Sequence, residues 1–190
     1  MIEASQKPSL GFTLAEVLVV IALLLVTVVL GLGIFFDNNL FYENQTGKIA
    51  VINATREVAD RLAEYGREAK AFESSYVYSG TTYSTGSATV IFRLPGRSAS
   101  GDILAGIYDH VIVSTDSADA AHLLLIVDPD PSSARPQREH LLTDRLTSLA
   151  FTYDNADVTQ AHNLSFEITA TSAGRHPATE TVDGQVTLRN

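Results

Sequence analysis

The chain has 190 residues, a formal net charge of −9 at pH 7 and no cysteine. The absence of cysteine excludes a disulfide framework, thiol catalysis and zinc sites built on cysteine. The acidic balance argues against general electrostatic binding of nucleic acid, which requires clustered lysine and arginine.

The first distinctive feature in chain order is a long apolar segment with one carboxylate at its entrance. Val17–Phe36 contains no charged residue, and a helix of about 20 residues spans about 30 Å of hydrocarbon. Glu16 comes directly before this segment. An unpaired carboxylate inside a bilayer costs on the order of a few kcal/mol. We therefore expect Glu16 either to stay at the wet interface or to have a partner.

The sequence GFTLAE at residues 11–16, with the apolar run that follows it, resembles the processing site of type IV prepilins and of type II secretion pseudopilins. The resemblance implies that a prepilin peptidase cleaves between Gly11 and Phe12 and methylates the new N-terminal Phe12. It also implies that Glu16 pairs with the N-terminal ammonium of a neighbouring subunit during assembly.

Two other interpretations of this segment stay open. A secretory signal peptide has an apolar core of about 7–15 residues and a small-residue cleavage site, whereas this run is longer and no clear A-x-A site follows it. An ordinary single-pass anchor would place Glu16 at the lipid headgroups.

The charges on either side of the apolar run predict its orientation. Lys7 precedes the run and Asp37 and Glu43 follow it, so the positive-inside rule places the N-terminus in the cytoplasm and the rest of the chain outside. Glu3 offsets Lys7, so the leader is less basic than the leader of most prepilins. The expected location is the cytoplasmic (inner) membrane, with one span.

The helix is expected to continue beyond the membrane. No proline occurs between Phe36 and Pro95, and apolar or small residues recur at helical spacing. They are Val51, Thr55, Val58, Leu62, Tyr65, Ala69 and Phe72. Gly31 and Gly33 mark a place where the helix can bend or melt, as a proline does near this depth in many pilins. The alternative is that glycine is simply frequent in membrane helices.

From residue 74 the pattern changes to β. Short runs rich in β-branched and aromatic residues alternate with turn signals such as Pro95-Gly96 and Asp183-Gly184. The expected strands are Tyr76–Tyr78, Ala88–Arg93, Tyr108–Val113, His122–Val127, Leu146–Tyr153, Leu164–Ala170 and Thr181–Leu188. Residues 132–139 are the expected mobile loop. A long helix followed by an antiparallel sheet predicts an α+β fold.

No residue pattern indicates catalysis or a cofactor. The five histidines lack the spacing of a zinc enzyme, and the sequence contains no Gly-x-Ser-x-Gly elbow and no Walker A loop. Asp128 and Asp130 are candidate oxygen ligands for calcium, but they do not follow an EF-hand pattern, and Pro129 between them suits a simple turn. The segment from Arg135 to Arg138 is expected to be a solvated loop.

The expected organisation is a leader at residues 1–11, a transmembrane helix half at 12–36, an amphipathic helix half at 37–73 and a β-rich head at 74–190. The resemblance implies a structural subunit of a type IV pilus-like filament or pseudopilus, and the order of parts is closest to a minor pseudopilin. Its expected partners are prepilin peptidase, other pilins or pseudopilins and an inner-membrane assembly platform. The alternative is a membrane-tethered extracytoplasmic binding or sensing domain that does not polymerise.

Overall fold

A computed structural model describes residues 13–174 and 177–189. The chain divides into two compact units, residues 1–43 and 44–190. The boundary between them falls inside a single helix, α1 (Leu14–Glu68). The described part of the first unit is almost entirely helical, and all of the described strands belong to the second unit.

The second half of α1 is amphipathic. Its buried residues, Val51, Thr55, Val58, Leu62, Tyr65 and Gly66, form one face, because positions three and four apart lie on the same side of a helix. The helix ends at Glu68, before the expected boundary at residue 73. The chain leaves the helix there because the backbone N–H of Lys70 donates to the carbonyl of Arg93, at 2.9 Å.

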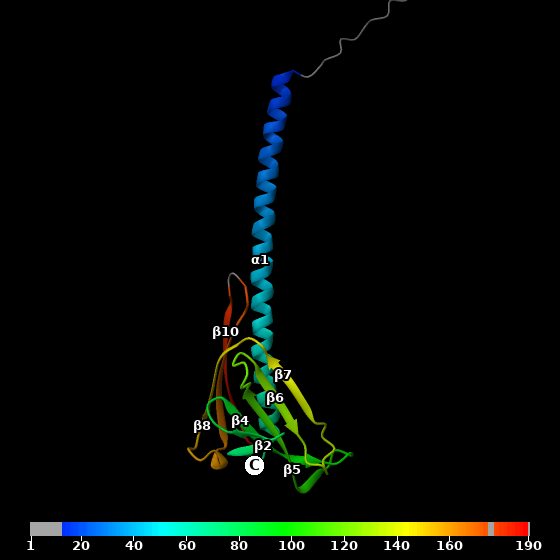
Figure 1. Ribbon diagram of the computed structural model, residues 1–190, viewed down its shortest axis with the longest axis vertical. Coiled ribbons are helices and arrows are strands. Elements are labelled where there is room, and N and C mark those ends of the chain that lie inside the picture. The colour runs from blue at the N-terminus through cyan, green and yellow to red at the C-terminus, as the bar shows by residue number, and fades with distance from the viewer. Residues whose placement is uncertain (1–12, 175–176, 190) are drawn as a thin grey trace, which may run out of the picture. The chain divides into compact units, whose positions relative to one another are not determined.

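The second unit contains three antiparallel sheets beside this half of the helix (Figure 1). The first has five strands in the order β1-β4-β5-β6-β7, the second three in the order β10-β9-β8, and the third is the β2-β3 hairpin. The bounds are β1 Ala71–Phe72, β2 Ser75–Tyr78, β3 Thr81–Ser84, β4 Thr89–Arg97, β5 Ile103–Thr115, β6 Leu123–Asp128, β7 Arg138–Thr143, β8 Leu146–Tyr153, β9 Asn163–Thr171 and β10 Thr179–Thr187. A short 3-10 helix, Val158–Gln160, precedes β9.

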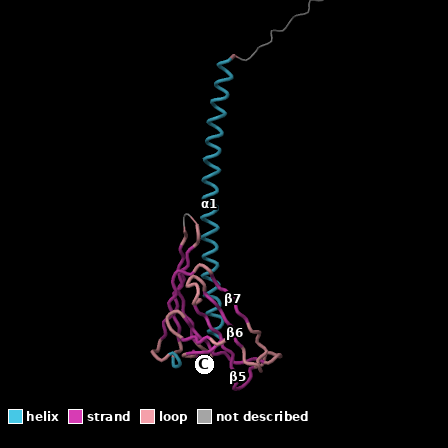
Figure 2. The backbone as a smooth tube through the Cα atoms, in the orientation of Figure 1, coloured by secondary structure: helices cyan, strands magenta, loops and turns pink. Residues whose placement is uncertain are grey.

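Figure 2 shows the strands of the second unit beside the lower part of α1. The main core joins the buried face of that helix to the five-stranded and three-stranded sheets. It joins Val58 and Leu62 of α1 to Phe92 of β4, Val111 of β5 and Ile168 of β9, all fully buried. A smaller cluster lies on the other face of the five-stranded sheet, where the tyrosines of β2 and β3 cover three isoleucines. Its members are Ile91, Ile112, Ile126, Tyr76, Tyr78 and Tyr83. The predicted α+β fold, a long N-terminal helix packed on antiparallel sheets, is confirmed.

Two of the expected turns lie inside strands. Gly184 belongs to β10 and pairs with Phe166 of β9, whose ring occupies the space where a Cβ would stand. Pro95 and Gly96 lie within β4 at a register shift, and the side chain of Ile107 fills the space beside Gly96. Glycine at these positions accommodates a bulky cross-strand neighbour rather than a change of direction.

Candidate functional site

The N-terminus of α1 is closed by a reciprocal pair of side chains. The Thr13 backbone N–H and hydroxyl both donate to Oε2 of Glu16, at 2.9 and 3.0 Å, and the Glu16 N–H donates to the Thr13 hydroxyl at 3.3 Å. This is a capping box, in which Thr13 is the N-cap residue and Glu16 the third helical residue. The role of Thr13 is not among the sequence expectations, although its spacing from Glu16 carries that signal.

The capping box does not depend on the residues before Phe12. Glu16 accepts a hydrogen bond from the backbone N–H of Thr13, which belongs to the peptide bond between Phe12 and Thr13. A chain cleaved between Gly11 and Phe12 therefore keeps this donor. Gly11 and Phe12 themselves lie outside the described residues. The Glu16 side chain is exposed, and within the described residues its second oxygen, Oε1, makes no hydrogen bond.

The segment that follows Glu16 has the character of a membrane span. In the described part of the chain, α1 is the one helix long and apolar enough to cross a bilayer, a test that an N-terminal signal sequence also passes. None of the apolar side chains from Val17 to Phe36 is buried. The hydroxyl of Thr27 donates to the carbonyl of Leu23, at 2.8 Å, so this polar group is satisfied without water.

Gly31 and Gly33 lie inside an unbroken helix. A Cβ added at either position would meet no atom within 4 Å, so nothing in the described chain requires glycine there. Their proposed role as a melting site therefore stays a prediction.

The two candidate calcium ligands are engaged in other contacts. Oδ2 of Asp128 accepts a hydrogen bond from the Tyr76 hydroxyl at 2.7 Å, and Oδ1 of Asp130 accepts one from the backbone N–H of Ser132 at 2.8 Å. Burial and the bond to Asp128 raise the pKa of Tyr76 to about 12. Among the described residues, no group of three or more histidine or acidic side chains is placed to hold a metal ion.

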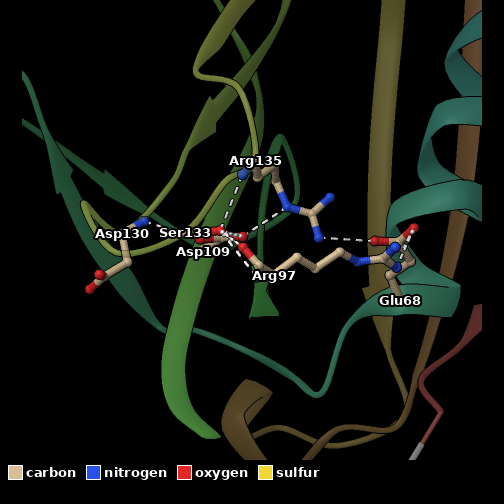
Figure 3. Close-up of polar contacts among 6 residues, drawn as sticks. All are labelled: Glu68, Arg97, Asp109, Asp130, Ser133 and Arg135. Atoms are coloured by element: carbon tan, nitrogen blue, oxygen red, sulfur yellow. Dashed lines mark hydrogen bonds and ion pairs between the residues drawn. The ribbon is translucent and has the colours of Figure 1, made fainter. Parts of the chain in front are cut away.

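The loop between β6 and β7 is instead held by a buried ion pair (Figure 3). Asp109 of β5 is fully buried. Its carboxylate accepts from the N–H of Asp130 at 3.0 Å, the hydroxyl of Ser133 at 2.9 Å and Nε of Arg135 at 2.8 Å. The expectation of a solvated loop is therefore wrong at Arg135, whose side chain is only 13% exposed.

Arg135 also joins the loop to the end of the helix. Its Nη2 lies 3.1 Å from Oε2 of Glu68, and Arg97 of β4 approaches Oε1 of the same carboxylate at 3.2 Å (Figure 3). Burial acts to lower the pKa of Arg135, but the hydrogen bonds that it donates to Asp109 and Glu68, together with their negative charges, outweigh burial and raise that pKa. A permanently charged guanidinium thus connects β5, the loop and the last turn of α1.

Two hollows on the head have sizes typical of small-ligand sites. One, of about 450 Å³, lies between α1 and β7 and is lined by residues that include Arg61, Tyr65 and His140. The other, of about 470 Å³, lies on the three-stranded sheet around Glu167 and Asp183. Neither of the two linings contains a serine or threonine beside a histidine, one of the pairings that activates a nucleophile.

No protein-family model, curated protein sequence or solved structure matches this chain. The structure establishes the architecture, a long N-terminal helix whose second half packs on antiparallel sheets, and this is consistent with a pilin-like fold. The family and the function rest on the residues themselves.

Proposed function

We propose that this protein is a structural subunit of a type IV pilus-like filament or pseudopilus, with its head outside the cytoplasm. A prepilin peptidase cleaves it after Gly11, and an inner-membrane platform inserts it into the filament beside other pilins or pseudopilins. The observation that carries the proposal is the sequence GFTLAE at residues 11–16, followed directly by the uncharged run Val17–Phe36 of α1.

The proposed assembly step depends on the carboxylate of Glu16. In the free subunit this group is occupied by its own helix terminus, through Thr13. Cleavage creates an ammonium at Phe12, and in a low-dielectric filament core an ammonium and a carboxylate attract each other far more strongly than in water. The ammonium of one subunit then pairs with Glu16 of the next and sets its axial position.

The capping box also supports a second candidate, a tethered domain that does not polymerise. Because Glu16 stabilises the start of its own helix, an exposed N-cap bond worth about 1 kcal/mol explains its presence without a neighbouring subunit. This candidate requires neither cleavage at Gly11 nor a negative charge at Glu16.

The first experiment is the intact mass of the protein from membranes with and without a prepilin peptidase. The proposal expects a peptidase-dependent product that begins with N-methylated Phe12. A chain that starts at Met1 in both preparations contradicts the proposal and favours the tethered domain.

Two substitutions at Glu16 separate charge pairing from capping. Glu16→Gln keeps the capping box, because glutamine completes it as well as glutamate does, but it removes the charge. We expect both Glu16→Gln and Glu16→Ala to be cleaved and inserted normally and to enter filaments at least about tenfold less than wild type, the effect of roughly 1.4 kcal/mol. The measurement is the amount of protein in sheared filaments. Normal incorporation of Glu16→Gln would show that Glu16 acts only as a helix cap and that its charge is not needed for assembly.

A further inference from the structure

The outer face of the three-stranded sheet carries an unfavourable pair of charges. Glu167 of β9 and Asp183 of β10 are direct cross-strand partners, and both side chains are exposed. Like charges directly opposite each other destabilise an antiparallel pair. In residues 13–174 and 177–189 neither carboxylate has an ion-pair partner.

The surroundings of this acidic pair leave room for a cationic side chain. Ala150 of β8 is the cross-strand neighbour of Glu167 on its other side, and Gly184 follows Asp183. These small residues help to line the hollow of about 470 Å³, whose other walls include Thr152, Ser165 and Gln185. The acidic face, defined as Ala150, Glu167, Asp183 and Gly184, is thus part of a polar hollow with two exposed carboxylates in its lining.

The complementary charge is present on α1 of the same chain. Between Asn44 and Arg56 the helix contains Lys48 and Arg56 and no acidic residue. Both cations are exposed, and Ile49 between them is 56% exposed. In the described chain neither cation has an ion-pair partner. The basic strip, defined as Lys48, Ile49, Asn53 and Arg56, ends where Glu57 and Asp60 begin.

We propose that the acidic face of one subunit binds the basic strip of a second copy of this chain. The net charge of −9 makes copies repel one another in most orientations, so a stable contact must match unlike regions. The contact joins two different surfaces and is therefore heterologous, and a heterologous contact that does not close into a ring generates an open helical filament. This inference rests on the proposed filament function and names the lateral contact between heads.

A charge exchange in the full-length protein tests the contact. Glu167→Lys with Asp183→Lys keeps a like-charge pair on the sheet, so the stability of the head should change little. It should lower incorporation into sheared filaments at least about tenfold. Lys48→Glu with Arg56→Glu should have the same effect, and the four changes together should restore incorporation to within about threefold of wild type.

The matched control is Asp102→Lys with Glu139→Lys, which changes the net charge equally at two exposed positions, one in the loop before β5 and one in β7, and should assemble normally. Circular dichroism of each purified variant verifies folding. Normal assembly of the Glu167→Lys, Asp183→Lys variant overturns the inference, and so does a fourfold variant no better than its parents. A fourfold variant that does not recover incorporation would mean that the acidic face binds a different protein and not a second copy of this chain. Wild-type protein that is neither cleaved nor assembled would contradict the proposed function itself.

Discussion

At the scale of single residues, Arg135 is the side chain whose loss the head should tolerate least. Its guanidinium lies 2.8 Å from the fully buried carboxylate of Asp109 and 3.1 Å from Glu68. Removing one partner of a buried ion pair leaves the other charge buried and unpaired, which typically costs about 3–5 kcal/mol. Asp109 keeps its bonds from the Asp130 N–H and the Ser133 hydroxyl. We therefore expect Arg135→Met to lower the free energy of unfolding by about 3 kcal/mol, measured by urea denaturation.

The matched control for Arg135 is Arg97, which contacts the same Glu68 but is 45% exposed. Exposed ion pairs contribute about 1 kcal/mol or less, so Arg97→Met should have a correspondingly small effect. Equal losses for the two variants would show that burial of the Arg135–Asp109 pair adds nothing to stability.

At the scale of elements, Gly66 governs how closely α1 approaches β10. Alanine is favoured over glycine inside a helix by about 1 kcal/mol, but a Cβ at residue 66 would overlap the side chain of Val186. Overpacking a core costs about 1–3 kcal/mol. We expect Gly66→Ala to destabilise the head by about 1 kcal/mol in urea denaturation, because the overlap costs more than the helix propensity of alanine gains.

The double variant Gly66→Ala, Val186→Ala identifies the cause of that loss. If the steric overlap is responsible, the two changes should compensate with a coupling energy of about 1 kcal/mol or more. Additive effects, or a Gly66→Ala variant as stable as wild type, would exclude close packing as the reason for the glycine.

The elements that the sequence predicts well are those with a regular apolar period. The stripe from Val51 to Tyr65 predicts the buried helix face, and the alternation in residues 164–170 predicts β9. The stripe also continues through Ala69 and Phe72, which are buried after the helix has ended. Local spacing cannot show this, because Ala69 reaches the core from the connection between α1 and β1, and Phe72 reaches it from β1 itself.

The strands and contacts that the sequence does not predict depend on distant partners. β7 starts at Arg138, inside the expected loop, and its charged sequence becomes a strand because β6 offers an edge to pair with. The Arg135–Asp109 pair joins residues 26 positions apart. No local sequence pattern can predict a contact over that separation. At the candidate site, the Thr13–Glu16 bonds follow from spacing alone, whereas the roles of Gly11 and Phe12 still rest on resemblance.

At the scale of the whole molecule, the head should fold without the first unit. Every described residue from Thr13 to Thr46 is exposed, and burial begins with Gly47 and Val51. A chain of residues 44–190 therefore keeps all of the described core. We expect its amide hydrogen exchange at Val58 and Leu62 to match that of the full-length protein in detergent within about tenfold, or about 1.4 kcal/mol.

A second truncation supplies the control for this prediction. A chain that begins at Val58 loses the buried side chains of Val51 and Thr55, and burying a valine side chain is worth about 1.5–3 kcal/mol. Its exchange at Leu62 should be faster by at least about tenfold. If residues 44–190 already exchange that fast, the first unit contributes to the stability of the head. If they do not, the core of the head does not depend on residues 1–43, and the proposed transfer of that unit from lipid into a filament would leave the head folded.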